Sequence, residues 1–217
     1  MLLFVCIQIN FGQTNHMTLT LISPGIGAGH LNLGMSKKEV KSIINSPYNT
    51  RTFEEECKAY SDNRYHLDSM VQCRIGFDEV WDYEPMPDYL PIFKLFFKKN
   101  ELCYIILSSY GYHGNLNNFE LKGGIHYHDS VSEIIKIFGQ PELKGKFKDF
   151  NDEGFQNADL FYEYWSKGIE FYIDDEKLTV IYLFKPVANL FSQPVSKQLL
   201  KVEKKLKDKN NKSGVRG

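Results

Sequence analysis

The chain has 217 residues and a formal net charge of −1, with 42% hydrophobic and 24% charged residues. This length suits one large domain or two of about 100 residues each, and the composition is typical of a folded soluble protein. The near-zero charge gives no electrostatic reason to expect nucleic acid or an anionic membrane as a partner.

Residues 1–13 read as the end of a secretion leader, because a short apolar run passes into small and polar residues. The usual basic region at the start of such a leader is missing, as in a leader truncated at its start. The run is too short to span a membrane. The sequence therefore predicts a periplasmic or secreted protein. The alternative interpretation is a buried first strand in a cytoplasmic protein.

The glycine-rich stretch from Pro24 to His30 superficially resembles a phosphate-binding loop. A dinucleotide fingerprint needs a helix that begins within the glycines, and a P-loop needs a following Gly-Lys-Ser/Thr. Neither is present, so we expect an ordinary loop that leads into the first helix.

The first helix is predicted between Ser36 and Pro47. Ser36 can cap it, Glu39 lies three residues on, as in a capping box, and Pro47 ends it. The same pattern returns from Asp129 to Pro141, with Ser130 and Glu133 in the capping positions. The segment between them begins with Thr52 to Tyr60, read as a short helix or as a strand and loops.

Two β-hairpins are predicted further along, from Ile92 to Leu107 and from Ile169 to Leu183, each with a four-residue polar turn between apolar runs. We also expect a strand region from Val71 to Val80, a proline-punctuated loop from Asp82 to Tyr89 and an exposed loop from Lys144 to Asp159.

The recurring helix and hairpin favour two tandem copies of one unit, at 18–110 and 116–186. A C-terminal helix with a basic, disordered tail is expected at 195–217. The predicted fold class is α+β, with a capped helix packed on an antiparallel β-meander in each copy. The expected core comprises Val40, Ile43, Ile44, Phe96, Ile105, Leu107, Ile134, Ile137, Phe138, Phe171, Ile181 and Leu183.

This layout resembles the beta-lactamase-inhibitor-protein fold, which is shared with the small outer-membrane lipoprotein of the barrel-assembly machinery. The resemblance rests on Leu33 to Pro47, Ile92 to Leu107, Asp129 to Pro141 and Gly168 to Leu183, under a third of the chain. It implies a helix on one face of a small antiparallel sheet, and a protein that acts by binding other proteins. The second copy departs from the pattern, with His126-Tyr127-His128 in place of Leu-Gly-Met, and no contact residue carries over.

No catalytic, cofactor or metal site is predicted. His113, His126 and His128 form a metal-like group only if they converge, and surface histidines are the simpler interpretation. Of the four cysteines, Cys6 lies in the predicted leader, and Cys57, Cys73 and Cys103 have no metal-binding spacing. A disulfide between Cys57 and Cys73 and three free thiols fit the sequence equally well. The acidic runs 54–56 and 174–176 are interpreted as solvated.

We therefore expect a non-catalytic exported protein-binding module, an inhibitor, assembly accessory or adaptor, that presents an aromatic-rich sheet face to another protein. Tyrosine and tryptophan are enriched in such contact surfaces. The alternatives are a cytosolic immunity-type protein that neutralises a toxin and a hydrolase-type enzyme without a recognisable motif. The candidate contact aromatics are Trp81, Tyr83, Tyr110, Tyr112, Tyr164 and Trp165.

Overall fold

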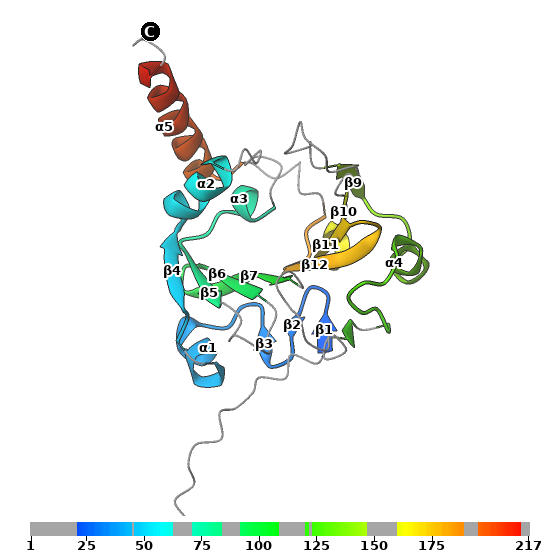
Figure 1. Cartoon of the computed structure of the whole chain (residues 1–217). Helices are drawn as coiled ribbons and strands as arrows, with labels where there is room; N and C mark the ends of the chain where they lie inside the picture. The colour runs from blue at the N-terminus through cyan, green and yellow to red at the C-terminus, as the bar shows by residue number, and fades with distance from the viewer. Residues whose placement is uncertain are drawn as a thin grey trace, which may run out of the picture.

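The structure, a computed structural model, describes residues 21–44, 46–62, 71–83, 92–108, 120–121, 123–146, 160–188 and 195–213. Its centre is an eight-stranded antiparallel sheet with the strand order β4-β5-β6-β7-β12-β11-β10-β9 (Figure 1). The strands are β4 (Asn49–Thr52), β5 (Glu79–Tyr83), β6 (Ile92–Lys98), β7 (Glu101–Ser108), β9 (Leu143–Lys146), β10 (Leu160–Tyr164), β11 (Ile169–Asp174) and β12 (Lys177–Phe184).

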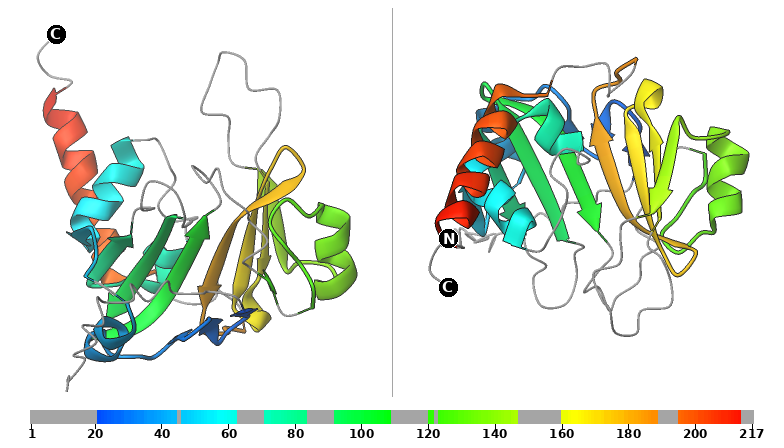
Figure 2. Two further views of the ribbon diagram at one scale, coloured as in Figure 1. Left: turned by 60° about the horizontal axis from the view of Figure 1, so that its bottom comes forward. Right: turned by 90° about the horizontal axis from the view of Figure 1, so that it is seen from above.

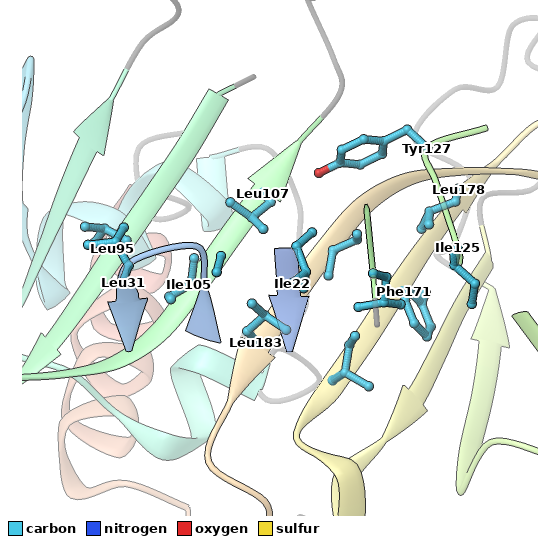
Figure 3. Close-up of a cluster of buried hydrophobic side chains, with 14 of the residues drawn as sticks. Ile22, Leu31, Leu95, Ile105, Leu107, Ile125, Tyr127, Phe171, Leu178 and Leu183 are labelled. Atoms are coloured by element: carbon cyan, nitrogen blue, oxygen red, sulfur yellow. The ribbon is translucent and has the colours of Figure 1, made fainter. Parts of the chain in front are cut away.

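A second, small sheet covers one face of the large one. It consists of β1 (Leu21–Ser23), β2 (Gly27–Ala28), β3 (Leu31–Asn32) and β8 (Glu120–Leu121). Ile22 and Leu31 point from it into a core shared with Ile105, Leu107 and Leu183 of the large sheet, all fully buried (Figure 3). The same core receives α1 (Lys37–Ile43) and α4 (Val131–Phe138), through Val40, Ile134 and Phe138.

Three helices cover the opposite face over the half of the sheet that holds β4 to β7: α2 (Phe53–Asp62), α3 (Val71–Ile75) and α5 (Lys197–Ser213) (Figures 1 and 2). Alternate residues of one strand therefore enter two cores. On β7, Ile105 and Leu107 join the first core, while Tyr104 and Ile106 join the second. This explains why the strands read as nearly continuous apolar runs, since neither face is left to water.

The two capped helices are attached to their hairpins in the same way. The Ser36 N–H donates to Glu39 Oε2 at 2.7 Å, and the Ser130 N–H donates to Glu133 Oε2 at 2.8 Å. Isolated bridges pair Ser36 with Glu101, where β7 begins, and Ser130 with Lys177, where β12 begins. The capping boxes predicted from the sequence are confirmed.

The hairpins also match each other in register. Each turns through two residues with positive φ, Lys99-Asn100 and Asp175-Glu176, so the four-residue turns expected from the sequence are shorter here. A register shift follows Phe96 in one hairpin and Tyr172 in the other. At the centre of the sheet, Ile106 of β7 lies opposite Tyr182 of β12. Because the pairing of β6 with β7 matches that of β11 with β12, an approximate two-fold axis that passes between Ile106 and Tyr182 relates the two halves of the sheet.

The α+β class is confirmed. The two hairpins and the C-terminal helix also form, and α5 extends to Ser213, past the Leu206 at which the apolar pattern ended. The interpretation as two tandem copies stays a prediction, supported by the matched registers. The predicted boundary near residues 110–116 and the leader at 1–13 lie outside the described residues.

Four segments differ from their predictions. Gly27–Ala28 form strand β2 inside the stretch expected to be an ordinary loop, and Asp82 and Tyr83 belong to β5 although the sequence predicted a loop from Asp82. Within Val71 to Val80, the first five residues form α3, which turns the buried Cys73 and Phe77 toward the sheet, and Gly76 (φ 73) ends the helix by donating to Gln72 O at 2.9 Å. Lys144 to Lys146, expected at the start of an exposed loop, instead belong to the edge strand β9 (Leu143–Lys146), because this strand pairs with β10. Pairing partners distant in sequence override weak local propensity.

The predicted core is correct at ten positions; Ile43 is half-buried, and Ile137 was wrong, with 43% of its surface exposed. The buried stripe of α4 runs through Ile134 and Phe138, flanked by Val131 and Ile135. Because a helix advances about 100° per residue, Ile137 falls outside that stripe. A two-turn helix at the side of the sheet buries only one narrow face.

Candidate functional sites

Two glutamates lie side by side inside the second half of the sheet. Glu163 of β10 and Glu170 of β11 are directly opposite each other in register, so both side chains leave the same face. Their residues are only 1% and 6% exposed. Their cross-strand neighbours, Leu143 and Tyr182, pack against the second core, which lies on the side of α2, α3 and α5 and is called the helix-side core below. The two glutamates therefore point to that face of the sheet. We refer to Glu163 and Glu170 as the acid pair.

Burial changes the protonation of the acid pair. It raises the pKa of Glu163 to about 7, although the Trp165 Nε1–H donates to Glu163 Oε2 and the charge of Arg74 acts in the opposite direction. The pKa of Glu170 is raised well above its ordinary value, first by burial and then by the charge of Glu163. Near neutral pH the acid pair therefore holds protons that exposed glutamates would have released.

The matching positions in the first half hold an ion pair instead. Asp82 of β5 lies opposite Lys94 of β6, and Lys94 lies opposite Ile106 of β7. In the second half, Glu163 lies opposite Glu170 in the same way, and Glu170 lies opposite Tyr182 of β12. Lys94 Nζ is 3.7 Å from Asp82 Oδ1, so opposite charges compensate each other on this side.

Glu56 of α2 completes a buried charge cluster with this pair. Its side chain is fully buried, with Arg51 Nη2 at 2.8 Å and Lys94 Nζ at 3.0 Å from its oxygens, and Arg51 Nη2 is also 2.7 Å from Asp82. The prediction that residues 54–56 are solvated was wrong for Glu56, because α2 turns that residue onto the sheet. Two acids and two bases attach α2 to β4, β5 and β6.

Four of the six candidate contact aromatics are described by the structure, and none of these four is on the surface. Trp81, Tyr83, Tyr164 and Trp165 are all buried, because both faces of the large sheet are covered. Tyr110 and Tyr112 lie outside the described residues. A sequence cannot show which aromatic strand residues a second layer will cover.

The histidines do not gather into a site in the described part of the chain. His128 is exposed with a φ of 68°, and His126 Nδ1 lies 3.9 Å from Asp129 Oδ2, which also accepts from the His126 N–H at 2.7 Å. His113 is outside the described residues. Within the described ranges no group of three or more His, Cys, Asp or Glu side chains is arranged to hold a metal ion.

Exposed aliphatic side chains are instead found on the small sheet and on α4. Of the five exposed large hydrophobic residues that the structure describes, three lie there: Leu21 (48%), Ile26 (57%) and Ile137 (43%). Leu21 pairs with Glu120 of β8. Gly123, just after β8, lies against Ile137: a Cβ atom added to this glycine would be 3.0 Å from Ile137 Cγ2. We call Leu21, Ile26 and Ile137 the aliphatic surface.

The acid pair and the aliphatic surface were both missed in the sequence. The signal for the pair was a single acidic residue inside each of two apolar strands, Phe161 to Trp165 and Ile169 to Ile173. No comparable signal marks the aliphatic surface, since Leu21 and Ile26 lie more than a hundred residues from Ile137 in the chain.

Fold and sites together define a three-layered α+β protein, in which other elements pack on both faces of a central antiparallel sheet. No protein-family model and no curated protein matches the sequence. No described helix combines the length and apolar character needed to cross a membrane.

Solved structures show weak likenesses. A DUF4309 family protein from Bacillus subtilis is 14% identical with a TM-score of 0.39, over 74% of this chain and 88% of that one. An extracellular protein containing a SCP domain from Bacillus anthracis is 8% identical with a TM-score of 0.38, over 78% and 52%. A proposed beta-lactamase inhibitor protein from Streptococcus mutans is 10% identical with a TM-score of 0.24, over 69% and 82%. At these scores the likenesses transfer no function to this chain.

Proposed function

We propose that this protein is a non-catalytic, exported protein-binding module, and that it contacts its partner through the aliphatic surface. The observation that carries the proposal is the exposure of Leu21, Ile26 and Ile137 on adjoining elements, while the aromatic residues described on the strands are used internally. Exposed aliphatic residues with a polar rim are typical of protein contact sites. The rim here includes the exposed residues Glu120, Glu133 and Lys136.

The rest of the described structure supports binding rather than chemistry. The acid pair is the one feature that favours the hydrolase alternative, because perturbed carboxyl groups often mark catalytic sites. Glu163 and Glu170 are so deeply buried, however, that neither meets a substrate from solvent in this fold. The immunity-type alternative relied on acidic clusters, but Glu54 pairs with Lys205 at 2.7 Å and Glu56 lies inside the charge cluster.

A photocrosslinking amino acid at position 26 or 137 should capture one discrete partner from the native envelope, whereas the same group at Tyr48 should not. Tyr48 is the matched control because it is 74% exposed but lies next to β4, at the far edge of the large sheet. Adding Leu21→Lys should reduce the captured partner at least about tenfold, since a charge there opposes apolar contact. Equal capture from all three positions would contradict the proposed surface.

Export is tested separately through the N-terminus. Expression in the native host should give a mature chain that begins near Thr14, because the leader would be removed. Mass spectrometry of the purified protein measures this directly. An uncleaved chain found in the cytosolic fraction would contradict export without affecting the proposed contact surface.

A further inference from the structure

We propose that Cys57 and Cys73 form a disulfide when the protein meets a disulfide donor, and that this bond ties α2 to α3. Cys57 lies on α2 and Cys73 on α3, sixteen residues apart in the chain. Their Sγ atoms are 3.9 Å apart, and both residues are fully buried. Both are free thiols in this structure.

The surroundings hold the two sulfur atoms against each other. Both cysteines belong to the helix-side core, with Phe53 of α2 and Phe77 just after α3, whose ring centroids are 4.8 Å apart. A disulfide bond is about 2.05 Å long, so closure requires the sulfur atoms to approach by roughly 2 Å. Side-chain rotation with a small shift of the five-residue helix α3 supplies such a movement.

The third described thiol is different. Cys103 lies on β7, is half-buried, and its Sγ donates to Phe96 O at 3.2 Å. Its sulfur thus points to a backbone carbonyl, whereas the sulfur atoms of Cys57 and Cys73 point to each other. Burial raises the pKa of Cys103 to about 12, as it also raises the pKa of Cys73, so geometry is what separates them. Cys103 therefore serves as an internal control that should stay reduced.

Closure needs an oxidant, and a small-molecule disulfide such as oxidised glutathione is sufficient. One cysteine thiolate attacks the donor, the donor S–S bond breaks, and one donor thiol leaves with a proton from solvent. The second cysteine loses its proton, attacks the protein-side sulfur of the mixed disulfide, and releases the second donor thiol. The two protein thiols thus lose two electrons and two protons, and the donor gains both.

The burial of the pair predicts slow exchange. Contact with Cys57 and burial raise the pKa of Cys73 far above its ordinary value, so hardly any thiolate is present while α2 and α3 are packed on the sheet. Exchange therefore proceeds through opening of this layer, and low concentrations of denaturant should accelerate it severalfold. Once closed, the bond should resist external reductants for the same reason.

The test is equilibration of the full chain with oxidised glutathione in mild denaturant, followed by return to native buffer, alkylation and peptide mapping. We expect a peptide linking Cys57 to Cys73, an alkylated Cys103, and a Tm higher than that of the reduced protein by roughly 5–10 °C. Cys103→Ser should close like the natural protein, whereas Cys57→Ala should yield no internal link at Cys73. Alkylation of both Cys57 and Cys73, or a link from either to Cys103, would overturn the proposal, and this measurement on the natural chain needs no variant to fold.

Discussion

Replacing Glu163 and Glu170 together with glutamine should make the free energy of unfolding nearly independent of pH between 5 and 8. Over the same range the natural protein should lose roughly 3 kcal/mol, because the pKa of Glu163 moves from 4.5 in the unfolded chain to about 7 in the folded one. Urea unfolding at pH 5, 6, 7 and 8 measures this.

The direction of the effect follows from the raised pKa values. Folded protein holds protons on the acid pair that the unfolded chain has already released above pH 4.5, so the contribution of the acid pair to stability is fully present below that pH and is lost as pH rises through 7. The capping carboxylates of Glu39 and Glu133 affect stability in a different pH range. Hydrogen bonds from Ser36 and Ser130 lower the pKa values of Glu39 and Glu133, and their contribution is lost only as pH falls below about 4.5.

Two further variants sharpen this experiment. Glu170→Lys copies the arrangement of Asp82 and Lys94 in the first half of the sheet, so it should also remove most of the pH dependence. Glu176→Gln, in the exposed hairpin turn, should leave the dependence of the natural protein unchanged. A natural protein whose stability is flat or rises between pH 5 and 8 would show that the acid pair is ionised and compensated in the folded state.

Truncating Ile134 to alanine should lower the free energy of unfolding by about 2–5 kcal/mol, whereas Ile137→Ala should cost less than about 1 kcal/mol. Ile134 is fully buried in the first core, and Ile137 is 43% exposed on the same helix. The pair shares residue type, helix and substitution, so the difference isolates burial. Chemical denaturation of both variants checks it, and equal losses would mean that the packing of α4 is not as described.

The two capped helices and the two hairpins were readable from the sequence because their signals are local, whereas α3 was predicted as a strand. A capping box predicts each of the two helices, with Ser36 and Glu39 in the first and Ser130 and Glu133 in the second. Two apolar runs around Lys99-Asn100 predict a hairpin. Each signal spans only a few neighbours in the chain. The α+β class followed from these elements.

Only the tertiary structure decided which residues are covered and which charges meet. The small sheet and the helix layer bury both faces of the large sheet, so Trp81 and Tyr164 became core rather than contact surface. Glu163 and Glu170 meet because their two strands pair in that register, and Ile137 is exposed because α4 buries only one stripe. The sequence determines which elements form, since capping and turn signals act between near neighbours. Burial and charge pairing depend on contacts between distant segments, which no local pattern encodes.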